Sequence, residues 1–233
     1  MVNASNSTLV VRDSERQYVY KPISGERPLW DFPDGTLAAR ERAAFLLSHS
    51  GGWNVVPETT LRVGPMGLGS FQNWVEAEPT SVDILEPHLV PENWHDVFTG
   101  VNENGKEVVL THANDLMLRR IALFDAVINN ADRKAGHILT DDHGQHFAID
   151  HGVTFHHEPK LRTVLWGWMG EEISDEETQL LQRSLEASNA PEFSELLTDT
   201  EIEALRSRIA ELIETRVFPE PSREWPAIPW PIF

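Results

Sequence analysis

The sequence predicts an α+β fold with a mainly β N-terminal lobe and a mainly helical C-terminal lobe. In residues 1–76, short runs of β-branched and aromatic residues are separated by turn residues, which is typical of strands. In residues 77–233, one long apolar segment and two amphipathic segments have helical periodicity. Strands followed by helices favour an α+β fold, and a chain of 233 residues is long enough for one domain built from two such lobes.

The N-terminal lobe is expected to contain two pairs of strands and one helix. STLVV and QYVY flank the polar turn RDSER, and WNVVPETTLRV and GSFQNWVE flank the Gly-rich turn GPMGLG. The segment between the two pairs begins with the cap-type residues Asp34 and Thr36, continues in good helix formers and ends at Gly51 and Gly52. We therefore expect the order strand, strand, helix, strand, strand.

The C-terminal lobe is expected to begin with an irregular connection, because AEPTSVDILEPHLVPENW is rich in proline. From Thr111, the segment THANDLMLRRIALFDAVIN is apolar on most sides, which predicts a helix buried in the middle of the lobe. HILT and HFAI, joined by the turn residues DDHGQ, then predict a short hairpin.

Two amphipathic helices and an apolar tail complete this lobe. SDEETQLLQRSLE begins with a capping box from Ser174 to Glu177. DTEIEALRSRIAELIETRVF has helical periodicity, with an apolar stripe formed by Leu205, Ile209, Leu212 and Ile213. The tail REWPAIPWPIF is rich in proline and tryptophan, so we expect it to pack on the body of the protein.

Composition limits the class of partner. Asp and Glu number 37 against 19 Lys and Arg, so the formal net charge is −18, and the chain has no cysteine. A field of this sign repels nucleic acids and anionic lipid surfaces, and the lack of thiols excludes disulfides and thiolate metal sites. The longest apolar run, IALFDAVI, is short and broken by Asp125, so we expect no membrane span and a cytoplasmic protein. The oligomeric state stays open.

Two carboxylates and a histidine surround the predicted C-terminal hairpin. Asp132 follows the buried helix on a loop, His137 stands at the start of the hairpin, and Asp150 ends its second strand. Because the hairpin folds the chain back, these three side chains can converge at one end of it. Phosphoryl transfer requires positioned positive charge, a metal held by oxygen ligands and a carboxylate aimed at the attacking hydroxyl. The pattern therefore indicates a phosphoryl-transfer site, with the alternative that Asp132 only caps a turn or pairs with Arg133.

The two loops resemble those of a known superfamily. ADRKAGHIL and FAIDHG are similar to the catalytic and metal-binding loops of the phosphatidylinositol 3- and 4-kinase-like branch of the protein-kinase-like superfamily, with patterns D-R-H-x-x-N and I-D-F-G. YKPISGERPLWDFPDGT and the tail resemble a bacterial, mainly actinobacterial, family usually labelled phosphatidylinositol-kinase-like. The resemblance covers nearly the whole chain. It implies a two-lobed protein-kinase-like fold that binds ATP and Mg²⁺ or Mn²⁺ between the lobes and transfers the γ-phosphoryl group to a hydroxyl.

The resemblance also implies roles for individual residues. Asp132 would be the catalytic base, Asp150 and His137 would be the metal ligands, and Lys21 would contact the nucleotide phosphates. Glu41 is the candidate partner of Lys21, because it shares a helix face with apolar residues and an acid in such a place requires a cation.

Further contacts to the nucleotide are expected from two segments of the N-terminal lobe. GSFQNWVE would be the hinge strand that meets the adenine, with Gln72, Trp74 and Val75. NASNST, with Ser5 and Ser7, would stand where other kinases have a glycine-rich phosphate loop, although it contains no glycine. We thus expect residues 1–76 to form a nucleotide-binding lobe that ends in the hinge and residues 77–233 to form the catalytic lobe.

Two departures from the family pattern affect the expected chemistry. His137 replaces the Asn that is the second metal ligand, and imidazole is a poorer partner than oxygen for Mg²⁺, so one tightly bound metal or a preference for Mn²⁺ is expected. His151 replaces Phe in the D-F-G triplet. The missing glycine loop and His137 keep open the alternative of a pseudokinase-like nucleotide-binding or protein-interaction module. Members of this superfamily also transfer AMP, so an AMP-transferring relative is a further alternative.

The acceptor is expected to be a small molecule or a protein side chain, because the charge of −18 disfavours a lipid surface. Lys160 and Arg162 follow Asp150, in the segment where an acceptor is expected, and they either bind an anionic acceptor or balance nearby acids. The histidines between positions 137 and 157 have no zinc-site spacing, so a dedicated histidine–metal site is not expected.

Overall fold

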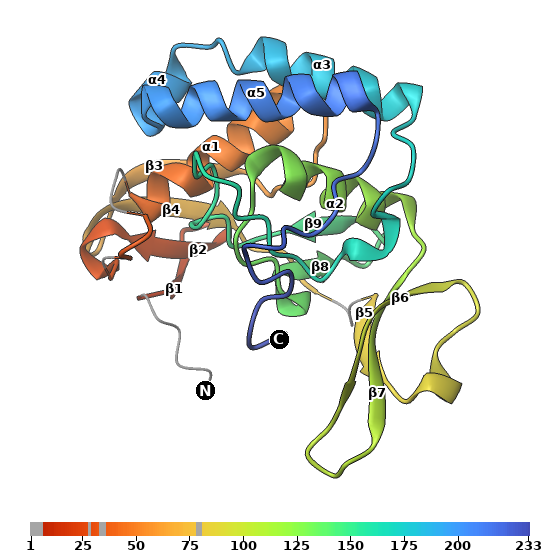
Figure 1. The fold of residues 1–233 in the computed structure, drawn as a ribbon. Coiled ribbons are helices and arrows are strands. Elements are labelled where there is room, and N and C mark those ends of the chain that lie inside the picture. Colours follow the sequence, from red (N-terminus) through yellow and green to blue (C-terminus); the bar gives the residue numbers. More distant parts are fainter. Residues whose placement is uncertain (1–6, 28, 33–35, 78–80) are drawn as a thin grey trace.

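The computed structural model describes residues 7–27, 29–32, 36–77 and 81–233, and it has an α+β architecture (Figure 1). The N-terminal part is rich in sheet and the C-terminal part is mainly helical, which confirms the fold class expected from the sequence.

The N-terminal part is built on a four-stranded antiparallel sheet. Its strands are β1 (Leu9–Arg12), β2 (Gln17–Pro22), β3 (Thr59–Gly64) and β4 (Gly67–Asn73), in the spatial order β1-β2-β4-β3. Both predicted strand pairs are therefore confirmed. Lys21 on β2 is paired in register with Ser70 on β4, so the lysine stands on an inner strand of the sheet.

A single helix, α1 (Leu37–Ser50), lies between these strand pairs. The Thr36 hydroxyl accepts a hydrogen bond from the Ala39 N–H, and the helix ends before Gly52, which has a φ of +80°. The predicted start and stop are thus confirmed, although Asp34 lies outside the described residues. α1 carries Glu41 at a buried position, where its carboxylate meets Lys21 of β2.

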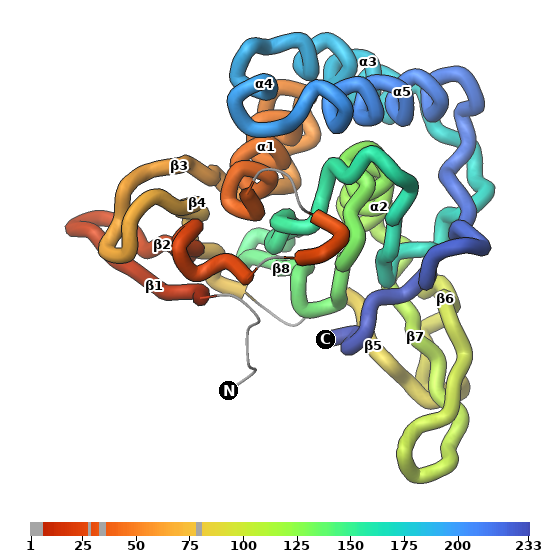
Figure 2. The backbone as a smooth tube through the Cα atoms, turned by 60° about the vertical axis from the view of Figure 1, so that its left-hand side comes forward, coloured from red at the N-terminus to blue at the C-terminus, as the bar shows by residue number. Residues whose placement is uncertain are grey.

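The chain between residues 82 and 113 forms a three-stranded sheet that the sequence analysis did not predict. β5 (Val82–Leu85), β6 (Trp94–Val101) and β7 (Glu107–Ala113) are antiparallel in the order β5-β7-β6 and extend away from the rest of the molecule (Figures 1 and 2). The expectation of an irregular connection over residues 77–94 was therefore wrong at Val82–Leu85, where β5 forms and no proline stands, and at Trp94, where β6 begins.

The buried helix of the C-terminal part begins later than expected. α2 spans Leu116–Ile128, and Thr111 belongs to β7 instead. The boundary has a clear cause, since the Asp115 carboxylate accepts hydrogen bonds from the N–H groups of Met117 and Leu118 at the first turn. α2 is otherwise buried as predicted.

The remaining elements follow the predicted order. β8 (Ile138–Thr140) and β9 (His146–Ala148) form the expected hairpin, followed by α3 (Asp175–Ala187), α4 (Glu192–Leu196) and α5 (Asp199–Thr215). The capping box between Ser174 and Glu177 is present. Short 3₁₀ turns occur at Ile23–Gly25 (η1), Pro87–Leu89 (η2), Ala135–His137 (η3) and Trp166–Trp168 (η4). None of the described helices is long and apolar enough to cross a bilayer.

One hydrophobic core joins the two parts. It contains Leu47 and Trp53 from the N-terminal part together with Phe124 and Leu181 from the C-terminal part. The helices α3, α4 and α5 cover α1 and α2 on the side away from the strands (Figure 1). Because this core is shared by both parts, α1 holds the N-terminal sheet at a fixed place beside α2 and the hairpin.

The C-terminal tail packs on the body, as the sequence predicted. The Ala227 carbonyl accepts hydrogen bonds from the Thr163 N–H at 3.0 Å and the Trp166 indole N–H at 2.8 Å. The Ile232 carbonyl accepts from the Ala135 N–H at 2.9 Å. The tail therefore connects the segment that follows Asp150 with the loop that follows α2.

Candidate active site

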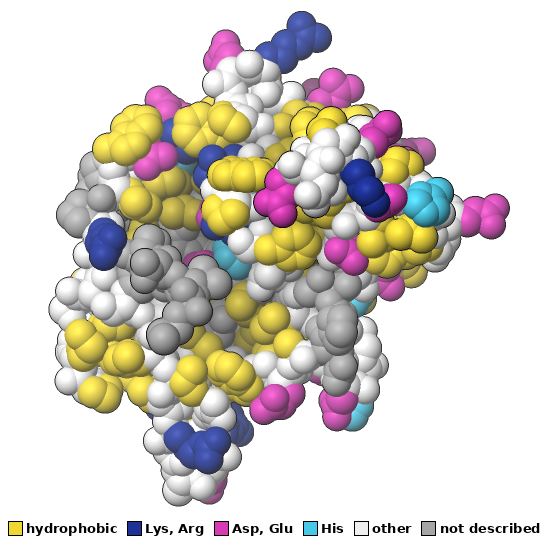
Figure 3. Space-filling model, turned by 90° about the horizontal axis from the view of Figure 1, so that it is seen from below, with side chains coloured by type: hydrophobic (Ala, Val, Ile, Leu, Met, Phe, Trp, Pro, Cys, Tyr) yellow, Lys and Arg dark blue, Asp and Glu magenta, His cyan; other side chains and the backbone are white. Residues whose placement is uncertain are grey.

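A cavity of about 570 Å³ lies between the N-terminal sheet, the loop after α2 and the C-terminal tail. We call it the main cavity. Seen from below, basic, acidic and histidine side chains meet in a hollow bordered by hydrophobic side chains (Figure 3). Four predicted site residues line the main cavity, namely Lys21, Asp132, His137 and Asp150. The convergence expected from the hairpin is therefore confirmed as geometry.

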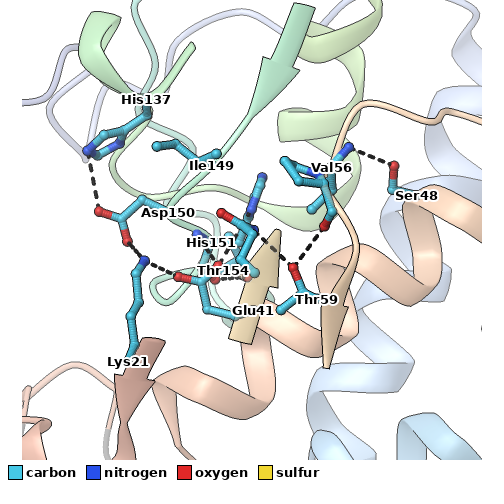
Figure 4. Close-up of polar contacts among 12 residues, drawn as sticks. Lys21, Glu41, Ser48, Val56, Thr59, His137, Ile149, Asp150, His151 and Thr154 are labelled. Atoms are coloured by element: carbon cyan, nitrogen blue, oxygen red, sulfur yellow. Dashed lines mark hydrogen bonds and ion pairs between the residues drawn. The ribbon is translucent and has the colours of Figure 1, made fainter. Parts of the chain in front are cut away.

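Lys21 lies between two carboxylates (Figure 4). Its Nζ donates to Oε1 of Glu41 and, at 2.9 Å, to Oδ1 of Asp150. The second oxygen of Glu41 accepts the His151 backbone N–H at 3.0 Å, so this buried carboxylate is bonded on both oxygens. The expected pairing of Lys21 with Glu41 is present, and it is tied to the loop that carries Asp150.

These contacts stabilise the charged forms of both partners. Burial alone lowers the pKa of a lysine, but Asp150 and Glu41 outweigh it and raise the pKa of Lys21. The Lys21 ammonium in turn holds the pKa of Asp150 below its ordinary value. At neutral pH Lys21 is a cation and Asp150 is an anion, which are the charge states that phosphate binding and metal binding require.

His137 contacts both acidic loops. Its Nδ1 lies 3.1 Å from the Asp132 carbonyl oxygen, and its Nε2 lies 3.3 Å from Oδ2 of Asp150. Burial lowers the pKa of His137 to about 4, so the ring is neutral at pH 7 and carries a single N–H. One of its two contacts must therefore bring two hydrogen-bond acceptors together. If the N–H faces the Asp132 carbonyl, Nε2 and the Asp150 carboxylate face each other as lone-pair donors.

Facing lone pairs on His137 Nε2 and on the Asp150 carboxylate fit a divalent cation bound together with phosphate. No group of three or more His, Asp or Glu residues within the described part of the chain could hold a metal by itself. Mg²⁺ in nucleotide sites is bound through one or two protein carboxylates plus substrate phosphates, so a complete protein cage is not required. A carboxylate oxygen of Asp150 and a ring nitrogen of His137 are one hard and one intermediate ligand type, a combination that suits Mn²⁺ at least as well as Mg²⁺.

Asp132 is flanked by two cations. Its Oδ1 lies 3.3 Å from Nη2 of Arg162, and its Oδ2 lies 3.4 Å from Nζ of Lys134. Burial raises the pKa of Asp132, and this effect exceeds the opposite effect of Lys134 and Arg162. The carboxylate is thus held in the cavity with a higher affinity for a proton than an exposed aspartate.

Arg133 connects α2 with the loop that carries Asp150. Its side chain is fully buried and forms a two-pronged ion pair with Asp125 on α2, with an Nε–Oδ2 distance of 2.8 Å. Its Nη1 donates to the Ile149 carbonyl at 2.6 Å, and its Nη2 lies 2.9 Å from Nε2 of His151. The alternative in which Asp132 pairs with Arg133 is therefore wrong.

Sequence reasoning missed the role of the Asp125–Arg133 pair. The available signal was the position of Asp125 inside the apolar run IALFDAVI, since a buried acid requires a cationic partner. Sequence reasoning also missed Lys134, which directly follows Arg133 and was not singled out.

None of the other predicted nucleotide contacts that the structure describes lines the main cavity. Ser7 lines a small second cavity beside Lys21, Glu41 and Asp150, whereas Ser5 lies outside the described residues. The Gln72 side chain is buried and donates to the Thr59 hydroxyl at 3.0 Å. The Trp74 N–H donates to the Gln17 carbonyl at 2.9 Å, and neither cavity is lined by Gln72, Trp74 or Val75.

Lys160 and Arg162 have different surroundings. Lys160 is buried, with its Nζ 4.1 Å from the centre of the Trp225 ring and 3.9 Å from a carboxylate oxygen of Asp31. Arg162 lines the main cavity, and its Nε donates to the Ala131 carbonyl at 2.6 Å. Of the two residues, Arg162 is the one that faces the cavity.

Fold and site together define an α+β protein whose sheet-rich part supplies a lysine, and whose helical part supplies carboxylates, to one charged cavity. The chain is 45% identical over 249 residues to Protein Rv2133c of Mycobacterium tuberculosis, an alignment that covers 99% of this chain and 89% of that protein. The chain belongs to the same family as Protein Rv2133c. No family model matches it.

Among solved structures, the chain is similar to the Helicobacter pylori proinflammatory kinase CtkA. The TM-score is 0.47 at 10% sequence identity, over 94% of this chain and 90% of that one. A likeness of this size says nothing about the activity of this chain.

Proposed function

We propose that the protein is an ATP-dependent phosphotransferase of the kinase-like type. The observation that carries this proposal is the position of Lys21, which is held between Glu41 and Asp150 in the same cavity as Asp132. Phosphoryl transfer depends mainly on positioning and on charge stabilisation, and this arrangement offers a fixed cation, a metal-binding carboxylate and a second carboxylate for the acceptor.

The nucleotide would be bound mainly by the N-terminal part. Lys21, oriented by Glu41, would contact the α- and β-phosphates, while Asp150 and His137 would hold a divalent cation. The cation, when bound, neutralises phosphate charge. Ser5 and Ser7 would add contacts to the phosphates, and the backbone of the proposed hinge residues Gln72, Trp74 and Val75 would meet the adenine outside the two cavities. In this proposal residues 1–76 form the nucleotide-binding lobe and residues 77–233 the catalytic lobe.

Asp132 would act on the acceptor. The acceptor oxygen forms a bond to the γ-phosphorus as the bond from that phosphorus to the bridging oxygen breaks, and ADP leaves with the electron pair. The proton of the acceptor hydroxyl passes to Asp132. The raised pKa of Asp132 supports this role, because a carboxylate with a higher proton affinity is a better general base.

The experiment uses ATP labelled separately at the α- and γ-phosphates, with Mg²⁺ or Mn²⁺ and a cell extract as the source of acceptor. We expect label to move only from the γ-position, and to stop moving in Asp132→Asn. Asp142→Asn is the matched control, because Asp142 lies in the β8–β9 turn with its side chain 80% exposed.

Two other results would overturn the proposal in different directions. Transfer of the α-label would identify an AMP-transferring enzyme, and ATP binding without any transfer would identify a pseudokinase-like binding module.

A further inference from the structure

The two ends of the main cavity differ in charge. At one end, the single cation Lys21 faces two carboxylates, Glu41 and Asp150. At the other end, the single carboxylate of Asp132 faces two cations, Lys134 and Arg162. The Asp150 end therefore has a surplus of negative charge, which suits a metal-bound nucleotide, and the Asp132 end has a surplus of positive charge. In a chain of net charge −18, this local surplus is unusual.

The two cations are positioned without being saturated. Arg162 is fixed by the 2.6 Å bond from its Nε to the Ala131 carbonyl, but its Nη2 reaches Asp132 only at 3.3 Å. Lys134 reaches the other carboxylate oxygen at 3.4 Å. Both distances exceed the usual length of a charge-assisted hydrogen bond. The guanidinium of Arg162 and the ammonium of Lys134 can therefore each donate a shorter hydrogen bond to an anion in the cavity.

An apolar part of the cavity wall comes from the C-terminal tail, and its Trp225 ring lies 5.9 Å from the Arg162 guanidinium carbon. Trp225, Pro231 and Phe233 line the main cavity, and the backbone bonds of Ala227 and Ile232 hold the tail in place. Such a wall offers aromatic and aliphatic surface to the body of a ligand whose charged group faces the cations.

Nearby charges do not cancel the surplus. Asp31 also lines the cavity, but the closest cation to it is Lys160, whose Nζ lies 3.9 Å away. Lys160 itself is buried against the Trp225 ring. Lys160 also lies 3.7 Å from the exposed Glu158 carboxylate, so it is paired with these two acids, whereas Arg162 and Lys134 are the cations beside Asp132.

We propose that the Asp132 end of the main cavity is an acceptor subsite for a small hydroxylated acid. Arg162 and Lys134 bind its carboxylate or phosphate group, Trp225 and Phe233 contact its apolar body, and its hydroxyl lies at Asp132. This inference rests on the proposed function and names the substrate class for it. A cavity of about 570 Å³ is in the size range of small-molecule sites, and the tail lies across it, so the subsite takes a free small molecule.

The test uses three probes that share a hydroxymethylphenyl body and differ in the group opposite the hydroxymethyl. They are 4-(hydroxymethyl)benzoate, 4-(hydroxymethyl)phenyl phosphate and the neutral 4-(hydroxymethyl)benzamide. Their affinities for the full chain are measured by calorimetry with and without ADP and Mn²⁺. We expect at least one acid to bind about tenfold more tightly than the amide, and the comparison of the two acids identifies the preferred anion. In Arg162→Gln and in Lys134→Gln we expect this preference for an acid to shrink towards one.

Two further variants separate charge from packing. Phe233→Leu should weaken all three probes by a similar factor, because it removes apolar wall and leaves Trp225, whose ring contacts Lys160 and Arg162, in place. Arg16→Gln is the control, since Arg16 is exposed and its ion pair with Glu58 is 3.7 Å long. Retained Tm values in the Gln variants show that the loss of preference does not come from unfolding.

The outcomes separate the subsite from the proposed function. Equal affinity for the three probes, or an acid preference that Arg162→Gln and Lys134→Gln both leave unchanged, overturns the subsite, whatever the labelled-ATP experiment shows. An acid preference that depends on Arg162, in a protein that transfers no γ-label, overturns the proposed function and leaves a binding site for small acids.

Discussion

Nζ of Lys21 lies 2.9 Å from Oδ1 of Asp150, although the two residues are 129 positions apart in the chain. The contact joins β2 of the N-terminal sheet to the loop after β9, and Glu41 on α1 holds the same ammonium from the other side. The lysine and the carboxylate are therefore brought together only when both parts of the molecule fold around their common core.

Asp150→Asn should abolish turnover without unfolding the protein. The Asp150 side chain is 48% exposed, and Lys21 keeps Glu41 as a partner, so we expect a change in stability below about 1 kcal/mol. The loss of the metal-binding charge should lower ADP release from ATP by roughly 10²-fold or more. Both are measured on one preparation, by coupled ADP assay and by urea unfolding. Turnover at the wild-type rate would remove Asp150 from the site.

Lys21→Met should weaken ATP binding by roughly 10- to 100-fold, because charge-assisted contacts to the phosphates are lost. The variant also leaves the buried Glu41 without its cation, which should cost stability on the order of 3 kcal/mol. Affinity is measured by calorimetry below the unfolding temperature of the variant.

The double variant Lys21→Met with Glu41→Gln separates these two effects. The neutral amide needs no cation, so we expect part of the stability to return while ATP affinity stays low. Recovery of affinity together with stability would show that Lys21 acts only as a structural partner of Glu41.

Local sequence patterns were sufficient for many elements of the fold. The Thr36 cap, the Ser174–Glu177 capping box and the β8–β9 turn depend on residues close together in the chain, and all three are present. The strand β5 was missed, because only four residues between proline-rich stretches form it and its stability comes from pairing with β7. Pairing with β6, in which Trp94 stands opposite Ala113, extends β7 to Ala113 and displaces the predicted start of the buried helix.

The residues of the candidate site that stand in local motifs could be predicted from the sequence. The contacts that only the tertiary structure brings together could not. Asp132, His137 and Asp150 could be placed together from the hairpin between them. Lys134 and Arg162 stand 28 positions apart and meet only around the Asp132 carboxylate, and the tail reaches the cavity through backbone hydrogen bonds that no side-chain pattern encodes.

Arg133→Met should destabilise the protein by about 3–5 kcal/mol, because it leaves the fully buried carboxylate of Asp125 without its cation. It also removes the donor to the Ile149 carbonyl, so the loop that carries Asp150 loses an anchor. Chemical denaturation measures the change. Arg16→Met is the matched control, since its ion pair is exposed and should contribute no more than about 0.5 kcal/mol. A loss for Arg133→Met as small as that of the control would contradict the proposed support role.

The acid limb of the pH–rate profile should report Asp132. Its pKa is raised by burial, and the group must be ionised to accept a proton, so kcat/KM should be high above this pKa and fall as the pH drops through it. Arg162 lowers the pKa of Asp132, so Arg162→Gln should move the limb to higher pH. Asp150 does not produce the limb, because Lys21 keeps its pKa below the ordinary value.

His137 also titrates in the acid range, with a pKa of about 4, so the profile is repeated in the His137→Asn background. The displacement caused by Arg162→Gln should persist there. A limb that stays at the same pH in both backgrounds when Arg162 is replaced would exclude Asp132 as the titrating group.

His137→Asn should change the preference between metals. The wild-type protein presents an imidazole nitrogen beside the Asp150 carboxylate, with Nε2 3.3 Å from Oδ2, and we expect higher turnover with Mn²⁺ than with Mg²⁺. An amide oxygen at position 137 supplies the hard ligand that Mg²⁺ prefers, so the Mn²⁺/Mg²⁺ ratio of turnover should fall towards one, and chelation of the metal should stop turnover in both proteins. His143→Asn is the control, because His143 lies in the β8–β9 turn with its side chain 84% exposed. An unchanged ratio in His137→Asn, with turnover retained, would mean that the second metal ligand is not at this position and that the neutral imidazole only orients Asp150.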